Sequence, residues 1–353
     1  MIETDHPVAV VEGPAAWHGR DLENSAEWLE TLSDAEIEEV LSAVEAIDNA
    51  GIAMLDVTRD NFPLPTLGPR LQQLATELDR GRGFWVLRGL PINELTERQA
   101  AFAYWGLGQY LGTPVSQNAR GHLLGHVIDE GRDFKTDPGV RGYQTRLRLP
   151  YHTDSSDVVG LLCLAPARTG GLSSVASTTT AFNEVVKRRP DLAHYWFKEW
   201  HYDRRNEERP GEDPFFTTPL ATWNDGLLSI RYVRNFLDSA QRHEGVPRRT
   251  AEETEFLDLV DEIANEPGIA LHMDFQPGDI QFVCNYSTFH SRTSYEDHPE
   301  PDRKRHLLRL WLTLDEGRPI PLDFGRGTQA GLSGRGGIAP VPAQHEALAG
   351  TYV

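Results

Sequence analysis

The sequence predicts an α+β protein, mainly β, built as a double-sheet barrel of jelly-roll type with helices packed on its outside. The first part of the chain has helical periodicity, and from Val127 onward short apolar runs alternate with turn residues. No internal repeat is present. We therefore expect one structural domain, with a helical N-terminal region at 1–82, a barrel core at 83–318 and a Gly/Pro-rich tail at 319–353.

The helical region is predicted from start and stop signals. Ser33-Asp-Ala-Glu36 has the form of a capping box, an apolar stripe follows it, and Gly51 ends the helix. A second helix is expected at 67–81 and a third at 96–112, with a buried strand at 83–91 between them.

The core is predicted from short strand-like runs. Two helices, near 180–189 and 251–266, interrupt them. The turn sequence QPGD at 276–279 is expected to join its two neighbouring strands into a hairpin. The expected strands are 146–154, 159–165, 171–177, 219–223, 227–233, 269–275, 280–286 and 306–314.

Composition limits the possible partners. With 34 basic and 53 acidic residues the net charge is −19, which disfavours nucleic acid and anionic membranes as partners. Cys163 and Cys284 lie in apolar runs and are expected to be small core residues, which suits a reducing compartment. No signal peptide or membrane-length run is present, so a cytoplasmic protein is expected; homo-oligomerisation stays open.

Four His-x-acid triplets are present where chance predicts about two. In the first, strand alternation places His152 and Asp154 on one face and Thr153 on the other. Two His and one carboxylate are typical of a non-haem Fe(II) site, and His290 is the candidate third ligand by its context. The triplet at 272–274 is a competitor on another strand, whereas those at 201–203 and 298–300 are expected in a solvated loop and a Pro-containing turn.

Arg305 and Arg309 lie four residues apart in an otherwise apolar strand. Burying two guanidinium groups is costly unless each meets an anion. A bidentate contact with a bound carboxylate would satisfy that need, and an internal Asp or Glu partner is the alternative.

Four motifs occur in order: His152-x-Asp154, GGLSSVAS at 170–177, QPGDIQFVCNYSTFHSRTSYED at 276–297 and RKRHLLRLWL at 303–312. Together they resemble the TauD/TfdA family of Fe(II)- and 2-oxoglutarate-dependent dioxygenases, over roughly 83–314. The resemblance implies a double-stranded β-helix and a metal triad of His152, Asp154 and His290. It also implies that Ser173 and Arg305 bind the far carboxylate of 2-oxoglutarate, and that Arg309 lies near the metal and meets the co-substrate or an anionic group of the substrate.

The expected reaction is oxidation of an aliphatic C–H bond of a small molecule, with Fe(II), 2-oxoglutarate and O2, and with release of succinate and CO2. Hydroxylation is the usual outcome in the family, and desaturation or cyclisation is possible; members also act on natural-product scaffolds of secondary metabolism. The alternatives are a cupin-like oxygenase or isomerase that does not use 2-oxoglutarate, and a non-catalytic ligand-binding barrel. Candidate substrate-binding residues are Arg146, Arg148, Gln117 and Asn118.

Overall fold

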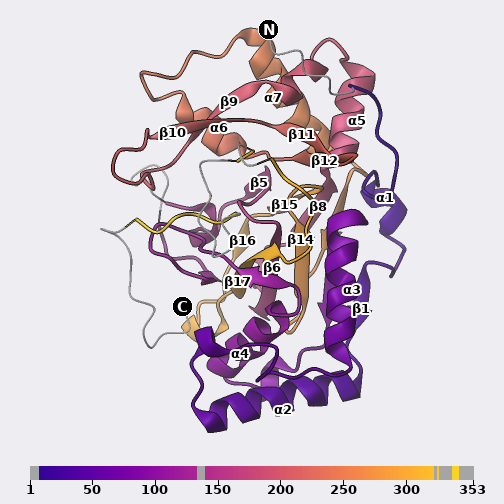
Figure 1. Ribbon diagram of the computed structural model, residues 1–353, viewed down its shortest axis with the longest axis vertical. Helices are drawn as coiled ribbons and strands as arrows, with labels where there is room; N and C mark the ends of the chain where they lie inside the picture. Colours follow the sequence, from indigo (N-terminus) through magenta and orange to yellow (C-terminus); the bar gives the residue numbers. More distant parts are fainter. Residues whose placement is uncertain (1–7, 133–139, 322–323, 326–335, 342–353) are drawn as a thin grey trace.

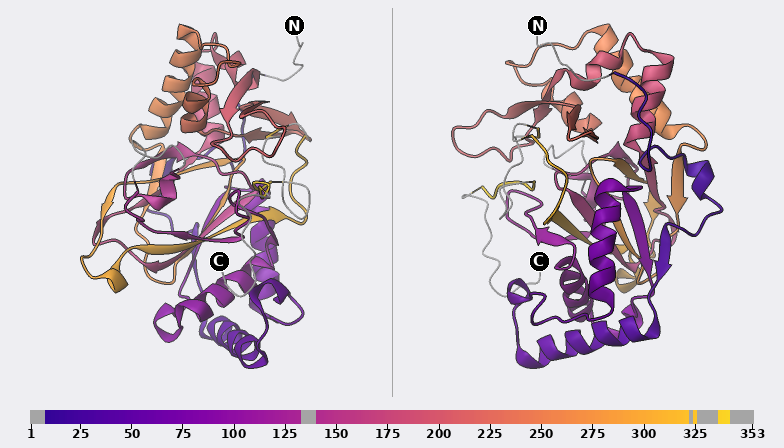
Figure 2. Two further views of the ribbon diagram at one scale, coloured as in Figure 1. Left: turned by 90° about the vertical axis from the view of Figure 1, so that its left-hand side faces the viewer. Right: turned by 45° about the vertical axis from the view of Figure 1, so that its right-hand side comes forward.

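The computed structural model describes residues 8–132, 140–321, 324–325 and 336–341. Within these ranges the fold is mixed α/β with most strands in two sheets, and helices lie at both ends of the β core (Figures 1 and 2). No helix of the described part has the length and apolar character needed to span a membrane.

The N-terminal helices form where local signals predict them. In α2 (Asp34–Ala50) the Ser33 hydroxyl accepts from the Glu36 amide and the Glu36 carboxylate accepts from the Ser33 amide, which confirms the capping box. Gly51, at φ 65°, ends this helix in the left-handed conformation. The other elements of this part are α1 (Gly19–Leu22), β1 (Leu29–Thr31), η1 (Met54–Asp56), α3 (Leu67–Arg80), β2 (Phe84–Arg88), η2 (Ile92–Glu94), α4 (Glu97–Gly108), β3 (Gly112–Pro114) and β4 (Leu124–Val127).

The rest of the chain supplies most of the strands. It contains η3 (Gly142–Gln144), β5 (Leu149–His152), β6 (Val158–Ala165), β7 (Thr169–Gly170), β8 (Ser173–Ser177), α5 (Thr178–Arg188), η4 (Ala193–Phe197), β9 (Glu199–Asp203), β10 (Phe215–Pro219), β11 (Ala221–Asn224), β12 (Leu227–Ile230), α6 (Arg234–Ala240), α7 (Ala251–Asn265), β13 (Ala270–Met273), β14 (Ile280–Cys284), β15 (Thr288–Arg292), β16 (Tyr295–Glu296), η5 (Pro301–Arg303) and β17 (His306–Leu314).

Two sheets make up the β core. The larger has seven strands in the order β1-β2-β14-β6-β17-β3, with β4 also paired to β17, and the smaller has the order β13-β8-β15-β5. β7 with β16, β9 with β10, and β11 with β12 form separate two-stranded ladders. The described strands therefore form separate sheets and no closed barrel, which corrects that detail of the prediction.

Three apolar clusters hold the layers together. One joins residues of β6, β14 and β17 in the larger sheet to residues of β8 and β13 in the smaller one, so it lies between the sheets. A second packs α2, α3 and α4 on the larger sheet, and a third packs α5 and α7 with β9–β12 on the smaller one. Cys163 and Cys284 are free thiols with no exposed surface, as predicted for small core residues.

The hairpin predicted around QPGD does not form. β13 pairs with β8 in the smaller sheet, whereas β14 pairs with β2 and β6 in the larger one. The turn thus crosses between the sheets. Arg88 anchors the end of this turn, since its guanidinium donates to both carboxylate oxygens of Asp279, at 2.8 and 2.7 Å.

Candidate active site

His152, Asp154 and His290 come together at one edge of the smaller sheet. His152 ends β5 and is the cross-strand partner of His290 in β15, with the two imidazole centroids 4.2 Å apart. Asp154 follows two residues after His152, and its carboxylate faces Nε2 of both rings. Its oxygens are 3.8 Å from Nε2 of His152 and 3.6 Å from Nε2 of His290.

This geometry suits a metal ion. One ligand-type atom from each of the three residues lies within 4.8 Å of the other two. Neighbouring ligands on an octahedron with bonds of about 2.1 Å are about 3.0 Å apart, so a small inward movement would complete the face. The Nδ1–H of His152 donates to the Pro150 carbonyl at 2.8 Å, which leaves Nε2 directed at the site.

The electrostatics favour neutral His152 and ionised Asp154, the forms that can bind a metal. Burial and the neighbouring His290 lower the pKa of His152 to about 4, against the opposing charge of Asp154. Burial by itself would raise the pKa of Asp154. The hydrogen bond with His290 and the charge of Arg309 more than offset that effect, so the pKa of Asp154 lies below its usual range.

Hydrogen bonds fix the ligand strand on its far side. The Thr153 amide donates to the Tyr232 carbonyl at 2.9 Å, and the Thr153 hydroxyl accepts from the Tyr232 amide at 3.0 Å. Thr153 therefore faces away from the metal position, as strand alternation predicts. On the next residue, the amide of Asp154 donates to Oδ1 of Asn285 at 2.8 Å.

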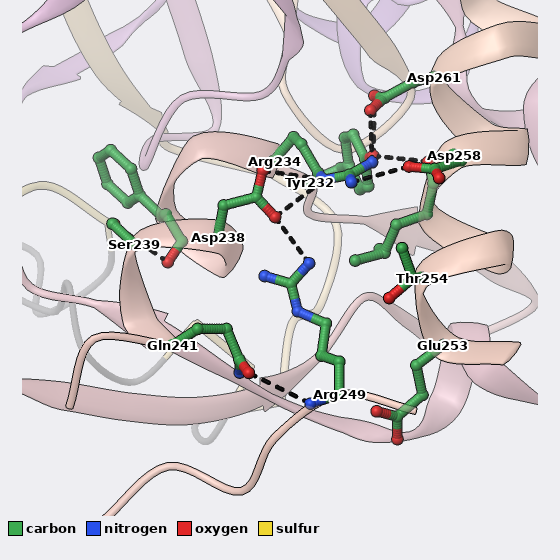
Figure 3. Close-up of polar contacts among 12 residues, drawn as sticks. Tyr232, Arg234, Asp238, Ser239, Gln241, Arg249, Glu253, Thr254, Asp258 and Asp261 are labelled. Atoms are coloured by element: carbon green, nitrogen blue, oxygen red, sulfur yellow. Dashed lines mark hydrogen bonds and ion pairs between the residues drawn. The ribbon is translucent and has the colours of Figure 1, made fainter. Parts of the chain in front are cut away.

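A charged network holds Tyr232 in turn, as Figure 3 shows. The Tyr232 hydroxyl donates to Asp261 at 2.8 Å, and Arg234 at the start of α6 forms ion pairs with Asp238, Asp258 and Asp261. Asp258 and Asp261 lie on α7, so this network fastens α6 to α7 next to Tyr232, the backbone partner of Thr153.

Arg309 and Trp311 contact the Asp154 carboxylate from β17. The Trp311 indole N–H donates to Oδ2 of Asp154 at 2.9 Å, and Nη1 of Arg309 is 3.7 Å from the same oxygen. Gln117 holds the arginine in place, because its side-chain oxygen accepts from Nε of Arg309 at 2.7 Å and its amide nitrogen donates to the Arg309 carbonyl at 2.8 Å. The ring of Tyr143 lies 4.5 Å from the guanidinium carbon.

Arg305, directly before β17, is a second buried arginine. It is 4 % exposed, its guanidinium carbon is 5.1 Å from the centroid of Tyr295, and burial lowers its pKa. A Cβ on Gly171 would stand 3.1 Å from its Nε, so glycine is needed for this approach. Ser173 is also buried, and its hydroxyl donates to Oε1 of Gln281 at 3.0 Å.

A cavity opens beside the triad. Its walls combine aromatic and apolar side chains with cationic ones, and among the described lining residues Asp154 is the only carboxylate. The backbone at 336–341 covers one side, where the amide of Ile338 donates to the Ser116 carbonyl at 2.8 Å. The residues that line the cavity include Gln117, Val140, Arg141, Gly142, Tyr143, His152, Asp154, Arg205, Phe236, Arg309, Trp311 and Ile338.

Two of the predicted substrate-binding residues lie elsewhere. Arg146 and Arg148 are exposed and do not line this cavity, and Arg148 donates to the side chain of Asn265. The parity argument fails because the register of β5 on β15 shifts: His290 pairs with His152, whereas Arg292 pairs with Leu149. Asn118 turns its oxygen to its own loop, where it accepts from the amides of Arg120 and His122, at 3.0 and 3.3 Å.

The other His-x-acid triplets hold no metal group within the described residues. His272 is exposed on β13 and lies 2.7 Å from the Ser174 hydroxyl. The prediction of a solvated loop for the triplet at 201–203 is wrong. These residues lie on β9, and buried Asp203 pairs with Arg242 and His243.

Sequence reasoning missed Trp311, Arg292, Arg141 and Arg205. Trp311 has the same parity as Arg309 on β17, a signal that could have revealed it. Arg292 follows His290 by two residues and could have been found in the same way. Arg141 and Arg205 lie in irregular chain, where no periodicity indicates direction.

Comparison with known proteins decides the family. The sequence pattern of the taurine catabolism dioxygenase TauD, TfdA family matches residues 49–311. The chain belongs to the TauD/TfdA family. Members of the TauD/TfdA family are Fe(II)- and 2-oxoglutarate-dependent dioxygenases, so the protein is a non-haem iron oxidoreductase, as the motifs predict.

Relatives of the TauD/TfdA chain cover most of its length. It is 34 % identical to FR-33289 synthase of Streptomyces rubellomurinus, over 88 % of this chain and 92 % of the relative. It is 32 % identical to the taurine hydroxylase-like protein SAT17 of Stachybotrys chartarum, over 85 % and 79 %.

Solved structures share the fold. An asparagine oxygenase in complex with Fe(II), 3-hydroxyasparagine and succinate superposes with a TM-score of 0.62 at 19 % identity, over 81 % of this chain and 94 % of the other. The non-haem iron oxygenase OrfP, in complex with Fe and α-ketoglutaric acid, gives 0.61 at 16 % identity over the same shares.

Proposed function

We propose that His152, Asp154 and His290 hold the catalytic Fe(II) of a 2-oxoglutarate-dependent hydroxylase. The observation behind this proposal is the convergence of their ligand atoms beside the cavity, with one carboxylate oxygen of Asp154 already hydrogen-bonded to Trp311. The bound iron would supply the oxidation, in which 2-oxoglutarate loses CO2 to give succinate while one atom of O2 enters a C–H bond of the substrate. The two sheets would then be the halves of the family's jelly roll.

The chain's own residues would place the reactants. Arg305 and Ser173 would bind the distal carboxylate of 2-oxoglutarate, since Nη1 of the buried Arg305 guanidinium has no hydrogen-bond partner among the described residues and favours an anion there. Gln117 and Tyr143 would orient Arg309 beside the metal position, and residues 336–341 would shield the cavity from water.

Anaerobic titration tests the proposal. Addition of Fe(II) and then 2-oxoglutarate to the wild type should give the weak visible metal-to-ligand absorption band, and His290→Ala should abolish it. His272→Ala is the matched control, because it removes an imidazole from another strand outside the metal cluster. Absence of the band from the wild type, or its persistence in His290→Ala, would contradict the assignment.

We further propose that the substrate bears an anionic group. Arg141, Arg205 and Arg309 all line the cavity of a chain whose net charge is −19, so the cations are concentrated where a ligand would bind. Their partners include Glu207 for Arg141, the Val140 carbonyl for Arg205, and Gln117 and Asp154 for Arg309. The relatedness to a taurine hydroxylase-like protein agrees with this class, because taurine is a sulfonate.

The substrate class can be tested by stimulation of 2-oxoglutarate turnover. Small carboxylates, sulfonates and phosphorus oxyanions should increase succinate formation, and their neutral amides or esters should not. Stimulation by neutral compounds to the same extent would contradict an anionic substrate.

A further inference from the structure

Arg292 presents a buried charge that the assignments above do not use. It ends β15 two residues after His290 and is 5 % exposed. Its guanidinium carbon lies 4.8 Å from the centroid of Tyr295, and that of Arg305 lies 5.1 Å from the same centroid. The two guanidinium groups therefore share one aromatic ring.

Several polar atoms of this cluster have no hydrogen-bond partner among the described residues. Nε and Nη1 of Arg292, Nη1 of Arg305 and the Tyr295 hydroxyl are all buried without a hydrogen-bond partner. Among the described residues, no carboxylate lies within ion-pair distance of either guanidinium; Asp297 accepts from the backbone amide of Arg305, and the charges of Asp297 and Asp129 act on the arginines from farther away. Two buried cations and a phenol with unused donors are costly unless an anionic ligand satisfies them.

The third guanidinium nitrogen of Arg292 contacts the backbone next to the cavity wall. Its Nη2 donates to the carbonyls of Thr145, at 2.7 Å, and of Leu147. The Thr145 amide and hydroxyl both bond the Gly142 carbonyl, at 3.2 and 3.0 Å. Gly142 and its neighbour Tyr143 line the cavity, and Tyr143 stacks on Arg309.

We propose that Arg292 is the second guanidinium for the distal carboxylate of 2-oxoglutarate and that it couples the binding of this carboxylate to the order of the cavity wall at 142–147. This inference rests on the proposed function, which assigns that carboxylate to Arg305 and Ser173. Arg292 is a binding residue toward the co-substrate and a positioning residue toward the substrate. Co-substrate binding would thus prepare the cavity for substrate.

Hydrogen exchange on the wild-type protein tests the coupling directly. With Fe(II) bound and O2 absent, 2-oxoglutarate should slow amide exchange in peptides that span 142–147. The matched probe is 2-oxopentanoate, which keeps the chelating keto acid and lacks the distal carboxylate, and it should bind without slowing exchange there. Equal protection by both compounds would overturn the coupling.

Variants test the binding role. Arg292→Gln should raise the Kd for 2-oxoglutarate at least tenfold in the absorption titration and remove the protection at 142–147, while the Kd for 2-oxopentanoate stays within twofold. Arg292→Lys, which restores the charge without the fork of donors, should recover part of the affinity. Arg88→Gln is the control for loss of a half-buried arginine elsewhere. An unchanged Kd in Arg292→Gln would overturn the proposal.

The failure of this inference is distinguishable from that of the proposed function. If the wild type gives no band with Fe(II) and 2-oxoglutarate, the proposed function fails and this inference fails with it. If the wild type binds and Arg305→Gln loses affinity while Arg292→Gln does not, only the role of Arg292 is refuted. Should Arg292→Gln not fold, as judged by circular dichroism, the comparison of the two keto acids on the wild type still decides.

Discussion

Trp311 is the residue whose role is easiest to isolate. Its indole N–H is the hydrogen-bond donor to Oδ2 of Asp154, so it orients the carboxylate without touching the metal position. Trp311→Phe should keep the apolar volume, lose the bond and weaken Fe(II) affinity by about 10- to 100-fold, the usual effect of removing such a partner. Competition with a metal-sensitive dye would measure this. Trp223→Phe, on β11 outside the ligand set, is the control.

A histidine pair outside the active site gives a pH prediction. Nδ1 of His126 lies 2.7 Å from Nε2 of His306, and Glu97 is nearby. Burial lowers the pKa of His126, and burial with the charge of His126 lowers that of His306. Below about pH 6.5 the unfolded chain takes up protons that the folded pair resists, so stability is lost as pH falls and is fully present above that value.

The double substitution His126→Gln with His306→Gln should therefore lessen the acid sensitivity. Between pH 7.5 and 5.5 its Tm should fall less than that of the wild type, by about 2 °C or more. Differential scanning calorimetry at both pH values gives the comparison. A parallel fall in both proteins would show that the pair does not couple folding to protonation.

At the scale of the element, local signals predicted better than long-range ones. The capping box at Ser33 and the end of the helix at Gly51 depend only on neighbouring residues, and both are confirmed. The QPGD turn is also local, but the sheet that each flanking strand joins depends on β8 and β6, which lie far earlier in the chain.

The site shows the same division. The order of motifs along the chain predicted three side chains that the fold brings together, although strand alternation related only His152 and Asp154 and the context of the motif indicated His290. Strand alternation also predicted that Arg148 lies on the same face as His152. This prediction failed because the register of β5 on β15 shifts by one residue between His152 and Leu149. Arg141 and Arg205 could not be placed at all, because irregular chain has no period to read.

The junction between α6 and α7 supports a prediction about stability. Arg234 is 17 % exposed in its side chain and pairs with three carboxylates, two of them on α7 (Figure 3). Arg234→Gln should lower the free energy of unfolding by about 1–2 kcal/mol after allowance for solvent screening of the exposed partners. It should also raise the substrate KM more than it lowers kcat, because α6 borders the cavity.

Denaturant unfolding and steady-state kinetics together measure this. Arg188→Gln is the matched control. The Arg188 side chain forms ion pairs with Glu184 on α5 and with Glu266, is 39 % exposed and lies away from the cavity. Its effect should stay within about 1 kcal/mol with kinetics unchanged. A larger loss in the control than in Arg234→Gln would refute the special position of α6.

The acidic whole molecule contrasts with its cationic cavity. The chain has a net charge of −19, yet the described cavity wall contains several arginines. An anionic substrate would be repelled by the net negative charge of the protein and attracted by the arginines that line the cavity. Salt screens surface charges more than buried ones, so the repulsion weakens first.

KM for an anionic substrate should therefore stay level or fall as ionic strength rises from about 0.01 to 0.15 M, where the screening length shortens from about 30 to 8 Å. Initial rates at several salt concentrations, with 2-oxoglutarate saturating, measure the trend. A steep rise in KM over that range would mean that the field outside the cavity attracts the substrate.

The pairing of His152 with His290 has a consequence for handling the protein. β5 is four residues long, lies at the end of the smaller sheet and pairs with β15 alone. A metal ion bound by both histidines would cross-link this edge strand to β15, and chelation of the ion would remove the cross-link. Metal-free preparations should then aggregate faster through the loosened edge than iron-loaded ones, so purification in EDTA would lose material that a divalent ion protects.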